Sequence, residues 1–93
     1  MSYESIDQII TAWASKHDLH IYTTCRDDEV RSVDLIGSNS HKCQLWIDAP
    51  NENGKVEVHV WDYKNRTKNY IVTTDDLPRC LEQAYATATK WVG

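Results

Sequence analysis

Phenylalanine is absent from this 93-residue sequence, and its aromatic residues are four Trp and five Tyr. Both residue types join an apolar ring to a polar group, so they suit positions that are half buried and half wet. The sequence also lacks internal repeats, linkers and low-complexity segments. It therefore predicts one domain over residues 1–93, with one modest core and little room for a deep catalytic cleft.

Cysteine is sparse, and Cys25, Cys43 and Cys80 lie far apart along the chain. An odd number of widely spaced cysteines is not a disulfide framework. No Cys-x-x-Cys or His-x-x-x-His pair occurs, so we predict neither a metal site nor any other cofactor. The N-terminus has no apolar run and no segment is long enough to span a membrane. We therefore expect a soluble, cytoplasmic protein without a signal peptide or a membrane partner.

Positive charge is also scarce. The sequence has 10 Lys and Arg but 14 Asp and Glu, which gives a formal net charge of −4. Proteins that bind phosphate backbones normally carry a basic stripe, so this charge disfavours nucleic acid and is compatible with a basic protein partner. The sequence has no Gly-rich phosphate loop, no Ser-centred nucleophile elbow and no paired-carboxylate motif. A Cys–His nucleophile would need its cysteine in a cleft, whereas Cys25 and Cys43 are predicted to face the core. The sequence favours a non-enzymatic protein.

What is present is organised around residues 55–63, Lys-Val-Glu-Val-His-Val-Trp-Asp-Tyr. Three valines alternate with Glu57, His59, Trp61 and Tyr63, and this period of two predicts a strand with two unlike faces. The valine face belongs in a core. The opposite face should meet solvent, yet it carries Trp and Tyr.

Similar patterns place two helices and four more strands around this one. We predict a helix over residues 5–17, with Ser5 and Gln8 at the spacing of a capping box, and a last helix capped by Thr74 or Asp75 with Pro78 in an early position. The other strands are predicted over residues 19–25, 30–36, 42–48 and 68–73. The spacing between Val30 and Val33 breaks the alternation, which predicts a bulge or a frayed strand start.

This order of elements predicts an α+β fold, a two-layer sandwich of two helices and an antiparallel meander of four or five strands. Apolar stripes on the helices support it. They comprise Ile6, Ile9, Ile10, Trp13 and His17 in the first helix, and Leu77, Leu81, Ala84, Ala88 and Trp91 in the last. Two helices with one stripe each can cover one face of the sheet, so the other face should stay open.

Projecting each strand onto that face predicts an aromatic surface. The candidate binding residues are Tyr22, Trp46, His59, Trp61, Tyr63 and Tyr70, and they would share the face with His20, Asp34, Gln44, Asp48 and Glu57. If Asn53-Gly54 forms the hairpin turn, Trp46 and Trp61 are cross-strand or diagonal neighbours. Trp and Tyr are enriched at binding hot spots, and exposed apolar patches tend to mark interaction sites.

The sequence thus predicts a small acidic protein that binds another protein, or a second copy of itself, as an inhibitor, an immunity protein or a chaperone would. One alternative is nucleic-acid binding through an aromatic sheet face, although Asp34, Asp48 and Glu57 would repel phosphates. Another is a small-ligand or carbohydrate module that stacks on Trp46 and Trp61, although a flat sheet makes a poor pocket.

A purely structural interpretation stays open as well. Aromatic residues have a high strand propensity and pair across strands for stability alone. A loop or the C-terminus could cover part of the face. A register shift of one residue would turn Trp46 and Trp61 into the core.

Overall fold

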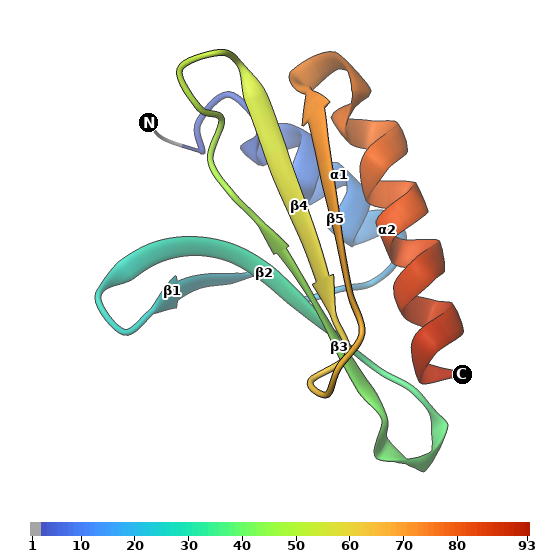
Figure 1. Cartoon of the computed structure of the whole chain (residues 1–93). Helices are drawn as coiled ribbons and strands as arrows, with labels where there is room; N and C mark the ends of the chain where they lie inside the picture. Colours follow the sequence, from blue (N-terminus) through green and yellow to red (C-terminus); the bar gives the residue numbers. More distant parts are fainter. Residues whose placement is uncertain (1–2) are drawn as a thin grey trace.

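The computed structural model of this chain describes residues 3–93, apart from the side chain of Asn39. Five antiparallel strands form one sheet in the order β1-β2-β3-β4-β5, which confirms the predicted meander (Figure 1). The elements are α1 (Asp7–Lys16), β1 (Tyr22–Cys25), β2 (Asp28–Ile36), β3 (Lys42–Ile47), β4 (Lys55–Trp61), β5 (Thr67–Thr73) and α2 (Leu77–Val92), with short 3-10 turns η1 (Ser38–Ser40) and η2 (Thr74–Asp76).

Both helices cover the same face of the sheet, as the sequence predicted (Figure 1). The longer helix, α2, lies across β3 and β4, and α1 packs beside it. Ala84 and Ala88 are fully buried, and their small side chains let α2 approach the sheet closely. The core between the layers is lined on the sheet side by Val33, Leu35, Cys43, Leu45, Ile47, Val56, Val58 and Val60.

The helix starts differ from the predicted ones. Before α1, the N–H groups of Ile6 and Asp7 donate to the carbonyl oxygen of Tyr3, so Ile6 occupies the N-cap and the predicted capping box at Ser5 is wrong. Before α2, residues 74–76 form a 3-10 turn, so neither Thr74 nor Asp75 caps the helix. Pro78 stands in the first turn as predicted, because no helical N–H is needed there.

The core faces of the strands follow the predicted alternation. Leu45 lies opposite Val60, and Ile47 lies opposite Val58, all with their side chains in the core. The hairpin between β3 and β4 turns at Gly54, which has a φ of +73°. The turn is held by the side-chain oxygen of Asn51, which accepts the backbone N–H groups at positions 53 and 55.

A bulge bends the β1–β2 hairpin. Tyr22 pairs with Ser32 but Thr24 pairs with Glu29, so β2 holds one more residue than β1 between these pairs. The bulge lies where the break in alternation between Val30 and Val33 predicted a bulge or a frayed strand start. Bulges bend a strand and increase its twist, and Figure 1 shows this hairpin turned away from the other three strands.

The first strand begins at Tyr22 and is therefore shorter than the predicted strand over residues 19–25. Leu19 and Ile21 precede it and pack against the core. Among the described residues, no helix combines the length and the apolar character needed to cross a membrane.

Candidate functional site

The candidate site is the sheet surface opposite the helices, called here the open face. Trp46 lies opposite His59 on β4 and Ser32 on β2, while Trp61 lies opposite Gln44. Directly paired residues point to the same side of a sheet. Because the valines of β4 face the helices, Trp46, His59 and Trp61 face away, and the two Trp are diagonal neighbours as predicted.

Exposed apolar side chains concentrate on the open face. Within residues 3–93, the exposed large hydrophobic residues are Tyr22, Ile36, Trp61, Tyr63 and Ile71. Strand pairing places four of them on the open face, and the hydroxyl of Tyr63 reaches across the same face to Asp34. No residue of this set belongs to α1 or α2. Sequence reasoning missed Ile36 and Ile71, which are 67% and 65% exposed.

Hydrogen bonds hold Trp46 in place on this face. Its indole Nε1–H donates to Oδ1 of Asp48 at 2.9 Å, and Oδ2 of Asp48 lies 2.9 Å from Nε2 of His59. The other ring nitrogen of His59, Nδ1, lies 2.6 Å from Oδ1 of Asn69. The network joins the end of β3 to β4 and β5, so these side chains are held in place on the open face.

His59 is the ionisable centre of this network. Each ring nitrogen faces an oxygen, and only the protonated ring can donate to both. Burial lowers the pKa of His59, but the hydrogen bonds to Asn69 and Asp48 outweigh burial and raise the pKa above its ordinary value of 6.5. The network therefore stabilises the charged imidazolium.

Tyr63 lies just beyond β4, whereas the alternation predicted it as the last outward residue of that strand. Its φ is +65°, and a left-handed backbone costs a residue with a Cβ roughly 1–2 kcal/mol. The ring packs on Trp61 with the centroids 4.5 Å apart, and the hydroxyl donates to Oδ1 of Asp34 at 2.6 Å. Burial, with the hydrogen bond to Asp34, raises the pKa of Tyr63, so its hydroxyl stays a neutral donor. Such strained residues cluster at functional sites.

The bent β1–β2 hairpin leaves a hollow on the open face. A cavity of about 200 Å³ is lined by Tyr22, Thr24, Cys25, Val30, Ser32, Asp34, Gln44 and Trp46. Asp34 is the only Asp or Glu in this lining, and no Lys or Arg takes part. The predicted core position of Cys25 is wrong, since Cys25 is exposed and lines the hollow. The bulge in β2 breaks the simple alternation on which that prediction depended.

Tyr70 does not belong to the candidate site, and its predicted place on the open face is wrong. It pairs with Val58, so its ring points toward the helices, where its hydroxyl lies 3.0 Å from Oγ1 of Thr87 on α2. Ile71 takes the outward position instead, opposite Glu57. The edge strand β5 mixes polar and apolar residues on both faces, so its sequence pattern gives no clear phase.

Among the described residues, potential metal ligands do not cluster, and Cys43 and Cys80 are buried. No group of three or more His, Cys, Asp or Glu side chains there could hold a metal ion. Burial raises the pKa of the Cys43 thiol, and it raises that of Cys80 to about 11. Both thiols therefore stay protonated, which is the unreactive form.

The open face thus combines exposed aromatic rings, a hydrogen-bond network and a hollow with one carboxylate. Comparisons of this chain with protein-family models, with curated proteins and with solved structures found no match.

Proposed function

We propose that this chain is a small non-enzymatic binding protein that docks another protein on its open face. The observation that carries this proposal is the concentration of exposed large hydrophobic side chains on that face and on neither helix. Trp and Tyr dominate binding hot spots, and apolar patches among polar groups tend to mark interaction sites.

Order within the face supports the same proposal. A side chain that is already fixed loses little conformational entropy when a partner binds. Trp46 is held by Asp48, and Tyr63 is held by Asp34 at a backbone angle that costs energy.

The hollow indicates what kind of partner fits. Small-molecule pockets usually measure roughly 300–1,000 Å³, whereas this hollow measures about 200 Å³, the scale of one side chain. Asp34 lies in it without a neighbouring Lys or Arg, and the chain has a net charge of −4. These features favour a basic protein whose cationic side chain enters the hollow. The corresponding role is that of a cytoplasmic inhibitor, immunity protein or chaperone.

The two alternative functions fit the face less well. Nucleic acid would meet the carboxylates of Asp34, Asp48 and Glu57, which repel phosphates. A sugar would need the flat ring of Trp46, but this ring is half buried and its N–H is already bonded to Asp48.

The test compares variants of the open face with one variant of the helix surface. Partners are retrieved from a lysate of the source organism with the tagged chain, and the Kd of each purified partner is measured by calorimetry. We expect Trp61→Ala and Tyr63→Ala to raise the Kd at least tenfold, or about 1.4 kcal/mol. Arg79→Ala, an exposed position on α2, should leave the Kd within about twofold.

Circular dichroism and melting temperature establish that each variant is folded. A partner that binds both open-face variants as tightly as the wild-type chain would contradict the proposal, and more clearly so if Arg79→Ala weakened it.

A further inference from the structure

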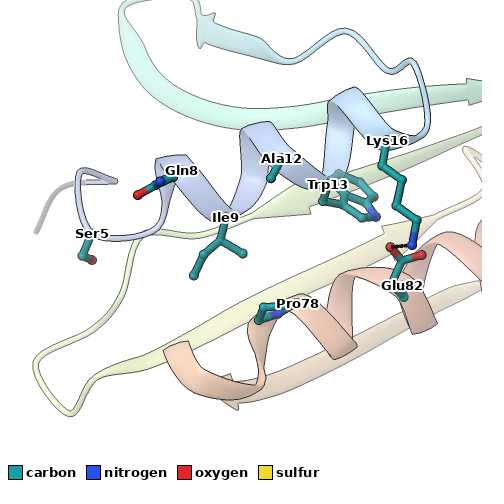
Figure 2. Close-up of a pocket in the computed structure, with 8 residues that line it drawn as sticks. All are labelled: Ser5, Gln8, Ile9, Ala12, Trp13, Lys16, Pro78 and Glu82. Carbon is teal, nitrogen blue, oxygen red and sulfur yellow. Dashed lines mark hydrogen bonds and ion pairs between the residues drawn. The ribbon is translucent and has the colours of Figure 1, made fainter.

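A second concavity lies on the other side of the molecule, between the two helices. Figure 2 shows the groove, whose volume is about 550 Å³ and whose lining consists of Ser5, Gln8, Ile9, Ala12, Trp13, Lys16, Pro78 and Glu82. This volume falls within the range of roughly 300–1,000 Å³ that small-molecule sites occupy. Most lining residues form one stripe along α1, and the short side chains of Ala12 and Pro78 leave the space between the helices open.

Trp13 lines this groove and carries a buried donor that has no partner. The residue is only 5% exposed, and its indole Nε1 is the one buried side-chain nitrogen or oxygen of the described chain without a hydrogen-bond partner. Buried polar groups in proteins are normally bonded, so an exception calls for an explanation. Trp13 meets the rings of His17 and Tyr85 edge-on, and an aromatic ring is at best a weak acceptor.

The unsatisfied N–H lies at the polar end of the groove. Figure 2 shows the indole nitrogen of Trp13 on the side of its ring toward Lys16 and Glu82. These two residues form an ion pair of 3.1 Å that bridges the helices, with Lys16 65% exposed. Exposed ion pairs contribute little stability, so Lys16 can turn to a new partner at small cost. Glu82 would keep its second contact, a distance of 2.8 Å to Nε2 of His17.

We propose that the groove between α1 and α2 binds a small carboxylic acid with an apolar body. The apolar body would lie along Ile9, Ala12 and Pro78. The carboxylate would accept hydrogen bonds from the indole N–H of Trp13 and from the ammonium group of Lys16. This site is separate from the open face and does not depend on the function proposed for it.

The chemistry of the two donors selects the ligand class. An N–H and an ammonium group both require an acceptor, and a carboxylate can accept from both at once. A protonated amine has no acceptor to offer, so it could pair with Glu82 but would leave the N–H of Trp13 unsatisfied. An apolar molecule without an acceptor could fill the groove but would leave the same donor unpaired. It would therefore bind more weakly than a carboxylate of the same size.

The test is an NMR titration of the full chain with four probes. Octanoate and 2-naphthoate are an aliphatic and an aromatic acid, while octylammonium and octanol match octanoate in length but replace the carboxylate. Each of the four Trp contributes one indole N–H signal to a ¹⁵N spectrum, and single Trp variants assign them. We expect at least one acid to shift the Trp13 signal downfield and saturably, whereas octylammonium leaves it in place and octanol, which can accept from the N–H but has no charge to pair with Lys16, binds more weakly than octanoate.

Matched variants locate the binding. Ala12→Leu fills the groove, while Ala86→Leu adds the same side chain at an exposed position of α2 outside the groove. Lys16→Gln removes the positive charge at this position. We expect Ala12→Leu to abolish the shift, Lys16→Gln to weaken acid binding roughly tenfold or more, and Ala86→Leu to bind as the wild-type chain does. Trp61→Ala, on the open face, should also bind normally.

Four results would overturn the proposal. The first is a Trp13 signal that neither acid shifts. The second is an equal shift with octylammonium or octanol, which would show that the site does not select a carboxylate. The third is normal acid binding by Ala12→Leu. A loss of binding in Trp61→Ala would place the acid on the open face and would equally refute this site.

Discussion

At the scale of single residues, His59 makes the open face sensitive to pH. Its protonated ring donates to both Asp48 and Asn69, which raises its pKa in the folded chain above the ordinary value of 6.5. The stabilisation is therefore complete below pH 6.5 and is lost as the pH rises through the raised pKa. We expect the free energy of unfolding, measured with urea at a series of pH values, to fall across that window.

An NMR titration of the His59 ring gives the pKa directly, and Asn69→Ala serves as the control. This variant removes one acceptor while leaving Asp48 in place, so the pKa of His59 should drop relative to the wild-type chain. A pKa at or below 6.5 in the wild-type chain, or no drop in Asn69→Ala, would show that the network does not hold the charged ring.

Tyr63 offers a test of backbone strain at the same scale. Its φ of +65° favours glycine over any residue with a Cβ, by roughly 1 kcal/mol. Tyr63→Ala and Tyr63→Gly lose the same contacts with Trp61 and Asp34, and they differ only in this backbone cost. We expect Tyr63→Gly to be the more stable variant in chemical denaturation, by about 1 kcal/mol. If Tyr63→Ala were more stable, residue 63 would not adopt the left-handed conformation in solution.

At the scale of elements, Gly37 fixes where the β2–β3 connection meets the end of α2. A Cβ at this position would lie 2.1 Å from the carbonyl oxygen of Val92 and 2.7 Å from its Cβ. Gly37→Ala should therefore push the last turn of α2 away from the sheet and destabilise the fold by roughly 1–3 kcal/mol.

Hydrogen exchange of the amides at the end of α2 reports the displacement, and the melting temperature reports the stability. Ser38→Ala is the control, because the neighbouring Ser38 is exposed and its change should stay within about 0.5 kcal/mol. Wild-type exchange and stability in Gly37→Ala would mean that the loop and helix are not in close contact.

The two faces of β4 give a second prediction at this scale. Val58 is fully buried between Ile47 and Tyr70, so Val58→Asp places a charge in the core and should abolish the cooperative thermal transition. The adjacent Glu57 points to the open face, and Glu57→Ala should change stability by no more than about 0.5 kcal/mol. A wild-type melting temperature for Val58→Asp would invalidate the register of the strand.

At the scale of the whole molecule, the charges of the open face disfavour a dimer formed through it. A two-fold dimer uses the same patch on both copies, so docking by the open faces would bring the carboxylates of Asp34, Asp48 and Glu57 together. We therefore expect a monomer of 10.8 kDa by light scattering across a concentration series. A dimer that Trp61→Ala dissociates would instead assign the open face to self-association.

Much of the fold could be predicted from local sequence patterns. In β3 and β4, burial of one face against the helices imposes a period of two on successive residues, so the outward positions of Trp46, His59 and Trp61 followed directly. The stripe of α2 followed for the same reason, with Leu77, Leu81, Ala84 and Ala88 in the core. The candidate site could be predicted where it rests on these strands.

The wrong predictions concern residues whose orientation depends on contacts with residues distant in the sequence. Tyr70 belongs to an edge strand, and only its pairing with Val58 sets which face it takes. Cys25 is exposed because one additional residue in β2 shifts the pairing of the hairpin. Tyr63 lies in a turn after the strand and has a left-handed backbone. The alternation of residues in β4 does not predict this conformation.

The sequence by itself determined the class of fold, the order of the strands and the valine face of β4, because these depend on residues close together in the chain. Only the tertiary structure decided the hollow beside Asp34 and the groove that holds the unpaired N–H of Trp13. Both concavities arise where segments far apart in sequence approach each other without filling the space between them. The size and position of these concavities depend on the packing of the whole chain, so they cannot be predicted from a local sequence pattern.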